Sequence, residues 1–239
     1  MNILIVNDDG IFAEGIKELA AAAVAFGKVT VVAPASQCSA MSHCITVRGD
    51  LTVKKESFPV HLVEAYSVSG TPADCVKVAM QHLLKEKPDI VFSGINFGYN
   101  VGVDILYSGT VGAAMEALVY QIPAIAFSMD VGGNYEIVHK FLKPIIEKLL
   151  KKEIGQGEMW NVNFPTCAVS ECKGIKEDCK PARISFYKDD FRMEEQGAGE
   201  WKLYPLSNRA MNWEEGTDID AVEHNYIAIG KLKNEILFG

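Results

Sequence analysis

The sequence predicts an α/β fold, in which a doubly wound and mostly parallel sheet is followed by a C-terminal β-hairpin extension. Two observations predict it. Short, continuous apolar runs alternate with segments of helical periodicity up to Pro165, as in βαβ units. After Pro165 the composition changes, and extended segments follow one another as they do in hairpins. We therefore divide the chain into a core, residues 1–158, and a C-terminal part, residues 159–239, that holds a strand return, hairpins and an oligomerisation extension.

Length and composition restrict the class of protein. The 239 residues suit one large α/β domain or one domain with a long appendage. Hydrophobic residues make up 49% of the chain, which is enough for a globular core. The formal net charge of −8 argues against a nucleic acid duplex bound to a basic face, but it leaves room for a small anion in a local pocket.

The sequence contains neither a recognisable membrane span nor a secretory signal. No stretch is long and apolar enough to cross a bilayer, and Met1 runs directly into the first apolar run. We therefore expect a cytoplasmic protein without a membrane partner. The six cysteines form no Cys-x-x-Cys pair, and the late group lacks a nearby histidine, so free thiols are expected rather than a zinc site. That late group is Cys167, Cys172 and Cys179.

The first βαβ unit is predicted from the N-terminal residues. Ile3–Val6 is a continuous apolar run, typical of a strand that is buried on both faces. Phe12–Phe26 is expected to be a helix, because its apolar residues recur at helical spacing before Gly27. Val29–Ala33 predicts the second strand. The polar segment Ala35–Cys44 that follows is expected to lie over the carboxyl edge of the sheet.

The next elements continue the alternation. Ile45–Val53 and His61–Val68 have the composition of strands and predict a hairpin. Thr71 is a suitable N-cap, with Pro72 at the first helical position, for a helix that runs to about Lys85. The expected elements that follow are a strand at Asp89–Ser93, a loop at Gly94–Gly102, a helix at Val111–Tyr120, a strand at Pro123–Ser128 and a helix at Tyr135–Lys152 that Pro144 bends.

The C-terminal part is predicted to be mostly extended. Strands are expected at Trp160–Phe164, Ala182–Tyr187, Trp201–Leu206 and Tyr226–Leu232. A charged turn that contains Gly197 and Gly199 separates the strand at Ala182–Tyr187 from the strand at Trp201–Leu206. A short helix capped at Thr217 precedes the last strand. Exposed hairpins often pair between subunits, so we predict a homo-oligomer.

Four segments that carry oxygen ligands or glycines are expected to meet at the carboxyl edge of the sheet, where open α/β sheets bind their ligands. They are Asn7–Gly10, Ser36–Cys44, Ser93–Asn96 and Ser108–Thr110. Asp8 and Asp9 would repel each other at the end of a buried strand, and a divalent cation removes that cost. Carboxylate, hydroxyl and amide oxygens favour Mg²⁺ or Mn²⁺ over zinc.

The Ser108–Thr110 segment precedes a predicted helix, whose N-terminus would hold a phosphate. A carboxylate-bound cation that faces a phosphate indicates metal-assisted phosphate ester chemistry. Simpler interpretations stand beside this one. In these interpretations Ser108 and Thr110 are plain helix caps, and Asn96 is a turn residue. Asp104 is then a solvated loop charge, and His43 is a packing or hydrogen-bonding residue.

Five ordered motifs resemble the SurE family, the stationary-phase survival protein nucleotidases. They are Ile3-Leu-Ile-Val-Asn-Asp-Asp-Gly10, Val32-Ala-Pro34 with Ser39-Ala40, Gly70-Thr-Pro-Ala-Asp-Cys-Val76, Ser93-Gly-Ile-Asn-x-Gly-x-Asn100, and Tyr107-Ser-Gly-Thr-Val111 with Ala114-Met-Glu116. The resemblance extends to Asn161-Val-Asn-Phe-Pro165 and to Thr217-Asp218 with Ala221-Val222. One departure is the segment Ala35–Cys38, which lacks a basic residue that family members often have there.

The resemblance implies a Rossmann-like catalytic core, a C-terminal extension exchanged between subunits, and homodimers or homotetramers. It also implies a phosphatase of nucleoside monophosphates, a 5′-nucleotidase and possible 3′-nucleotidase and exopolyphosphatase, with one divalent ion (Mg²⁺ or Mn²⁺) per subunit. The implied metal ligands are Asp8, Asp9, Ser39 and Asn96, with Asp8 or Asp9 as base or nucleophile, and the implied phosphate contacts are Asn100, Ser108, Gly109 and Thr110.

Three other interpretations compete with this one. A metal- and nucleotide-binding sensor of the same fold without turnover is separated from an enzyme only by assay. A response-regulator receiver needs an aspartate where Ser93 ends its strand. A phosphatase of the haloacid dehalogenase type needs Asp-x-Asp after the first strand, whereas Asp8 and Asp9 are adjacent.

Overall fold

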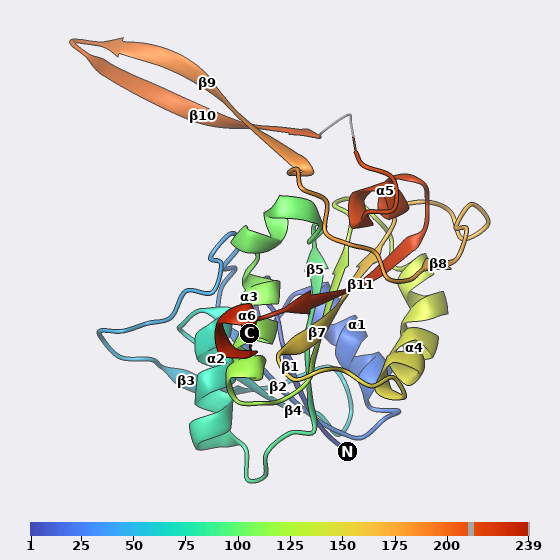
Figure 1. The fold of residues 1–239 in the computed structure, drawn as a ribbon. Coiled ribbons are helices and arrows are strands. Elements are labelled where there is room, and N and C mark those ends of the chain that lie inside the picture. The colour runs from blue at the N-terminus through green and yellow to red at the C-terminus, as the bar shows by residue number, and fades with distance from the viewer. Residues whose placement is uncertain (210–212, 239) are drawn as a thin grey trace.

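The computed structural model describes residues 1–209 and 213–238. Its main body is built on a nine-stranded sheet with the strand order β3-β4-β2-β1-β5-β6-β7-β11-β8. The bounds are β1 (Asn2–Val6), β2 (Lys28–Pro34), β3 (Val53–Glu56), β4 (Glu64–Val68), β5 (Ile90–Phe97), β6 (Ala124–Met129), β7 (Glu158–Phe164), β8 (Ile175–Lys176) and β11 (Ile227–Lys233). Helices cover both faces of this sheet (Figure 1).

The sheet is doubly wound and mostly parallel, as the sequence predicts. Every pairing from β4 through β2, β1, β5 and β6 to β7 is parallel, whereas β3 and β11 run antiparallel to β4 and β7. From β1 the chain proceeds to β2 on one side, and it returns to β5 on the other side. The crevice between the carboxyl ends of β1 and β5 is therefore the topological switch point, where open α/β sheets bind ligands.

The strand β1 is buried on both faces, as expected for a continuous apolar run. Ile3 and Ile5 join a core beneath α1 (Glu14–Ala23) and α4 (Glu136–Leu150). Leu4 and Val6 join a second core beneath α2 (Pro72–Val78) and α3 (Gly109–Val119). Two packed helical layers thus fix the carboxyl end of β1, where the paired aspartates follow.

Several predicted bounds are wrong. The β3–β4 hairpin exists, but its first strand begins at Val53, where the predicted strand ends, and residues 45–52 form no strand. The first helix is shorter at both ends than Phe12–Phe26. The second helix, α2, ends at Val78 and passes into a π-helical turn, η1 (Ala79–Leu83).

The strand β5 runs on to Phe97, although a loop was expected from Gly94. Its ladder with β6 shifts register between Ser93 and Asn96. Gly94 makes this possible, because a Cβ there would lie 2.2 Å from the Phe127 carbonyl oxygen. After β5 come the predicted loop and a 3₁₀ helix, η2 (Gly102–Tyr107).

The C-terminal part contains the predicted hairpin, formed by β9 (Tyr187–Gly197) and β10 (Glu200–Arg209), which projects from the body (Figure 1). The expected strand at Ala182–Tyr187 is wrong, because residues 182–186 are irregular. Ala182 and Phe186 are instead buried in a third apolar cluster with Tyr99 and Ile219. The remaining helices are α5 (Asp218–Glu223), capped by Thr217 as predicted, and α6 (Glu235–Phe238).

In the part of the chain that the structure describes, no helix has the length and apolar character needed to span a membrane.

Candidate active site at the carboxyl edge of the sheet

A cavity of about 520 Å³ lies over the carboxyl ends of β1 and β5. Five of the eight residues singled out from the sequence line it, namely Asp8, Ser39, Asn96, Asn100 and Ser108. Its other walls are Ala40, Phe97, Gly98, Tyr99, Asp104, Tyr107, Val131, Tyr187 and Phe191. The remaining three, Asp9, Gly109 and Thr110, lie next to residues that line it, as described below. The expected meeting of four segments at one edge is therefore seen.

Asp8 is almost completely buried, with 3% of its surface exposed. Its Oδ1 accepts a hydrogen bond of 2.6 Å from the Thr110 hydroxyl on α3. Burial, and after it the charge of Asp9, raises the pKa of Asp8 to about 6, although the Thr110 hydrogen bond opposes the shift. A carboxylate in this position would be stabilised by a cation.

Asp9 ties β1 to β5 and to the polar segment. Its Oδ2 accepts from the Phe97 backbone N–H at 3.0 Å, and its Oδ1 lies 3.5 Å from Gln37 Nε2. Burial raises the pKa of Asp9 as well. Gln37 also donates to Ser39 Oγ at 2.9 Å, so a single side chain links the carboxylate to the predicted serine ligand.

The polar segment that carries Ser39 is anchored at both ends. Before Ser39, the Cys38 N–H donates to the Asp8 carbonyl oxygen at 2.7 Å. After it, Ser42 donates from its backbone N–H to Tyr107 O and from its hydroxyl to Leu106 O. The segment then lies directly on α3. His43 is a hydrogen-bonding residue there, since its Nε2 lies 2.7 Å from the buried Glu116 carboxylate.

Asn96 stands at the end of β5 with its amide held in one orientation. Its Nδ2 donates to the Gly98 carbonyl oxygen at 2.7 Å. Because the nitrogen is engaged by the backbone, the oxygen Oδ1 is the atom left for a ligand, and an amide oxygen is a normal ligand of Mg²⁺ or Mn²⁺.

The start of α3 combines capping with close packing. Ser108 is the N-cap, and its Oγ accepts from the Val111 N–H at 3.0 Å. A Cβ on Gly109 would lie 3.0 Å from Asp8 Cβ, so a glycine allows the helix to approach the carboxylate. The Thr110 hydroxyl is bound to Asp8 and the Val111 N–H to Ser108, which leaves the Gly109 N–H at the start of the helix as a donor for an anion.

Asn100 contacts the cavity from the loop between β5 and η2. It is buried, and its Nδ2 donates to Ser128 Oγ on β6 at 2.7 Å. A hydroxyl both donates and accepts, so the same contact persists when the amide turns by 180° and presents its nitrogen to an anion.

Sequence reasoning missed the contribution of the hairpin. Tyr187 and Phe191 of β9 line the cavity, far along the chain from the four segments. Asp104 is not a solvated loop charge, because its Oδ2 accepts from the N–H groups of Phe186 and Tyr187 at 2.8 and 2.9 Å. It therefore fixes the start of β9 against η2. No signal in the sequence joins these distant positions.

The donors at this edge suit a hard cation. Among residues 1–209 and 213–238, no three of His, Cys, Asp and Glu gather as metal ligands, and no side-chain cation pairs with Asp8 or Asp9. The available atoms are two carboxylates, a hydroxyl and an amide oxygen, which fit Mg²⁺ or Mn²⁺ completed by water.

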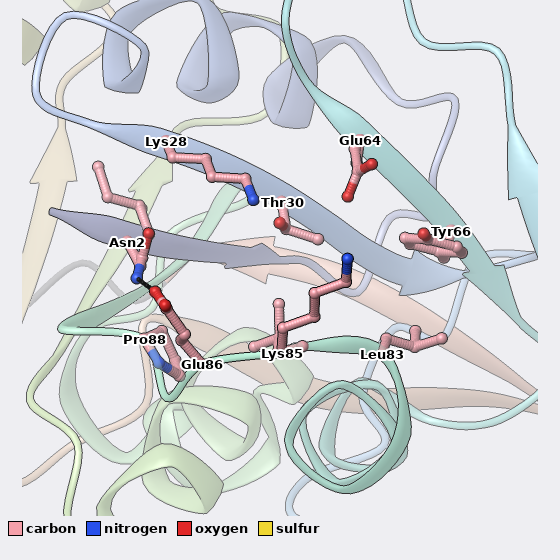
Figure 2. A pocket seen from close by; sticks show the side chains of 11 residues that line it. Asn2, Lys28, Thr30, Glu64, Tyr66, Leu83, Lys85, Glu86 and Pro88 are labelled. Carbon is pink, nitrogen blue, oxygen red and sulfur yellow. Dashed lines mark hydrogen bonds between the residues drawn. The ribbon is translucent and has the colours of Figure 1, made fainter.

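A second cavity, of about 290 Å³, lies at the opposite edge of the sheet (Figure 2). Lys28 and Lys85 line it together with Glu64 and Glu86, and Asn2 donates to Glu86 at 3.0 Å. The lysine and glutamate charges balance one another, and none of the predicted site residues lies there.

Comparisons with known proteins show what this chain is similar to. A family model described as survival protein SurE matches residues 3–186. The chain is 41% identical over 241 residues to 5′-nucleotidase SurE of Clostridium botulinum strain Langeland, covering 99% of this chain and 94% of that protein. It is 42% identical over 236 residues to 5′-nucleotidase SurE of Alkaliphilus metalliredigens, with 96% and 91% covered. The crystal structure of the SurE protein from Aquifex aeolicus matches with a TM-score of 0.83 and 34% identity, covering 100% of this chain and 97% of that one.

Proposed function

The chain belongs to the SurE family, and from this premise we propose that it is a 5′-nucleotidase, a phosphoric monoester hydrolase that releases phosphate from nucleoside monophosphates. One observation carries the proposal. The buried Asp8 carboxylate and the N-terminus of α3 face the same cavity, joined by the Thr110–Asp8 hydrogen bond of 2.6 Å. A cation on the carboxylate side and an anion on the helix side would thus be neighbours.

The metal would be one divalent ion per subunit, Mg²⁺ or Mn²⁺, held by Asp8, Asp9, Ser39 and Asn96. When bound, such an ion polarises a phosphoryl oxygen and lowers the pKa of a coordinated water. The protein's part is to hold the ligands in place. Phe97 N–H and Gln37 fix Asp9, Thr110 fixes Asp8, and Gly98 O fixes the Asn96 amide.

The phosphate would lie against Asn100, Ser108, Gly109 and Thr110. The first N–H groups of α3 have no partner within the helix, so they are donors for phosphoryl oxygens. They also stabilise negative charge that develops on those oxygens during the reaction. Thr110 would hold Asp8 next to the phosphate, because its hydroxyl and its backbone N–H both interact with that carboxylate.

Asp8 or Asp9 would act as base or nucleophile towards the phosphorus. Each has an oxygen within hydrogen-bond distance of a fixed donor, which orients the carboxylate. Both assignments require a deprotonated group, and a bound cation favours that form.

The nucleoside would occupy the other half of the cavity. Phe97, Tyr107, Val131 and Phe191 give that half an apolar and aromatic lining. Aromatic rings stack on bases of any kind, so this lining supports a nucleotide substrate without a strict choice of base. The apolar lining does not determine which phosphate ester of a nucleoside enters the site. The substrates to be tested therefore include 3′ esters and polyphosphate.

We also propose that residues 1–158 form the catalytic core and residues 159–239 the strand return and oligomerisation extension of a cytoplasmic homodimer or homotetramer. Met193, Trp201 and Leu203 lie on one face of the β9–β10 hairpin, and all are at least half exposed in the single chain. An apolar hairpin face of this kind is suited to burial against a second copy.

The proposed activity is tested by phosphate release from 5′- and 3′-nucleoside monophosphates and from polyphosphate, with Mg²⁺, Mn²⁺ or EDTA. Release that EDTA abolishes and metal restores is the expected result. A folded protein that binds nucleotide and releases no phosphate with either metal would instead be the sensor considered above.

A further inference from the structure

The Asn161-Val-Asn163 motif on β7 has no part in the function proposed above, yet both asparagine side chains are buried beside the site. Asn161 and Asn163 point to the same face of the sheet, because alternate residues of a strand do so. Asn163 is paired in register with Ser128 of β6, which holds the Asn100 side chain. The three polar residues therefore form a small platform beneath Asn100.

This platform grips the backbone of Asn100. Asn163 Oδ1 accepts from the Asn100 N–H at 2.9 Å, and Asn163 Nδ2 donates to the Asn100 carbonyl oxygen at 3.1 Å. Asn161 Nδ2 donates to the same carbonyl oxygen at 2.8 Å. Both backbone groups of Asn100 are thus satisfied by side chains in a segment that has left the β5 ladder.

The segment would otherwise have freedom to move. Gly98 and Gly102 stand at either end of it with φ of +142° and +55°, conformations that favour glycine. Between them the contacts to Asn100 and the Tyr99 N–H bond to the Tyr187 hydroxyl hold the chain in place. The asparagines therefore fix a residue that lies between two glycines.

Asn161 retains an unfavourable feature. Its Oδ1 is the one buried side-chain oxygen or nitrogen without a hydrogen-bond partner among the residues that the structure describes, and its side chain is 4% exposed. Burying an unpaired amide oxygen lowers stability. A residue chosen for stability alone would not be an asparagine here, so the value of Asn161 lies in the hydrogen bond from its Nδ2.

We propose that Asn161 and Asn163 are positioning residues that place Asn100 for contact with the substrate phosphate. The inference rests on the phosphate role of Asn100 in the proposed function. Neither asparagine touches the cation ligands, so their effect is expected on phosphate and substrate binding and not on the cation.

The test compares wild-type protein with Asn161→Leu, Asn163→Leu and the uncharged Asn163→Ser, whose side chain is too short to bind both backbone groups of Asn100. Four quantities are measured: the Kd of inorganic phosphate with Mn²⁺ present, KM and kcat for a nucleoside monophosphate, the Kd of Mn²⁺, and the unfolding temperature. Thr30→Val, a buried polar residue at the opposite edge of the sheet, is the matched control.

We expect the Kd of phosphate and the KM to rise by about fivefold or more in each asparagine variant, because a misplaced contact weakens binding. The Kd of Mn²⁺ should stay within a factor of about two, since its ligands are unchanged. Asn161→Leu should unfold at the same or a higher temperature, because it removes the unpaired oxygen. Asn163→Ser adds neither a charge nor an apolar group beside Asn100, so it gives the binding result even if a leucine variant fails to fold.

Two results would overturn the inference. Unchanged phosphate binding and KM together with a lower unfolding temperature would assign both residues a purely structural role. Equal losses of phosphate and Mn²⁺ affinity would indicate general damage to the site. An added Asn100→Ala variant separates the two proposals: if it weakens phosphate binding while the Asn161 and Asn163 variants do not, only this inference fails, and if it has no effect, the phosphate role of Asn100 fails as well.

Discussion

At the scale of single residues, the site depends on a carboxylate kept in an unfavourable environment. Asp8 is buried beside Asp9, and the hydrogen bond from the Thr110 hydroxyl offsets part of the cost of burying its charge. In the metal-free protein the raised pKa means that the charged form destabilises the fold. Stability is thus given up at the position where a cation is expected, as is common at functional sites.

Asp8→Asn should abolish phosphate release and stabilise the metal-free protein at neutral pH. The pKa of Asp8 lies near 3.8 when unfolded and at about 6 when folded, so its stabilising contribution is full below 3.8 and is lost as the pH rises through 6. The shift corresponds to ~3 kcal/mol at pH 7.5, which the neutral amide would recover. Denaturant unfolding in EDTA at pH 4 and 7.5 measures this gain, which should fall to less than ~1 kcal/mol at pH 4. Equal free energies of unfolding for the wild-type protein and Asp8→Asn at pH 7.5 would refute this prediction.

At the scale of elements, the site depends on how closely loops approach α3. A Cβ on Gly112 would lie 2.3 Å from the Ser42 carbonyl oxygen and 3.0 Å from His43 Cα. Only glycine therefore lets the Ser39 segment lie against the helix. Asp104 holds the hairpin close to η2 in a similar way, because its carboxylate accepts from the backbone N–H groups of Phe186 and Tyr187.

Gly112→Ala should weaken Mn²⁺ binding by about tenfold, because the backbone that carries Ser39 must move away from Asp8. Alanine raises intrinsic helix stability by about 1 kcal/mol, so α3 itself is not weakened. Titration calorimetry with Mn²⁺ measures the effect, and Val119→Ala at the exposed end of the same helix is the control. Wild-type affinity in Gly112→Ala would exclude close approach as the determinant.

Phe191→Ala should raise the KM for nucleoside monophosphates by about fivefold to tenfold, since stacking on one base contributes ~1–3 kcal/mol. The Kd of inorganic phosphate should not change, because the ring is apolar and offers no hydrogen bond to an anion. Steady-state kinetics and phosphate titration provide both values. A parallel rise in the two constants would place Phe191 at the phosphate instead of the nucleoside.

At the scale of the whole molecule, local patterns predicted the body of the fold, and tertiary packing decided the rest. The β1 strand, the Thr71 and Thr217 caps and the alternation of strands and helices follow from apolar periodicity and capping chemistry. Asn7–Gly10 and Ser108–Thr110 could be placed at one edge because parallel strands share a carboxyl edge.

What the sequence did not reveal depends on contacts between distant residues. The extension of β5 to Phe97 depends on Gly94 meeting Phe127, and the irregular residues 182–186 depend on burial of Phe186 against Tyr99. Likewise, Tyr187 and Phe191 enter the cavity only because the base of the hairpin is fixed by Asp104 and by the Arg209–Asp130 ion pair of 2.7 Å. No local pattern records such contacts.

The hairpin also predicts how the molecule assembles. The double variant Met193→Lys, Leu203→Lys introduces two charges at cross-strand neighbours on the apolar face. Burying them against a second subunit is costly, so we expect the variant to be monomeric and the wild-type protein to be a dimer or tetramer. Light scattering after size-exclusion chromatography measures this. The same mass for both proteins would show that this face is not the interface.

The most direct test of the account is a crystal structure of the protein with Mn²⁺ and phosphate, with the anomalous signal of manganese recorded. We predict one anomalous peak at ~2.0–2.3 Å from oxygens of Asp8, Asp9, Ser39 and Asn96. The phosphate should lie beside it, bound by the first N–H groups of α3. A manganese peak away from these four residues, or a phosphate bound elsewhere than at the start of α3, would contradict the account.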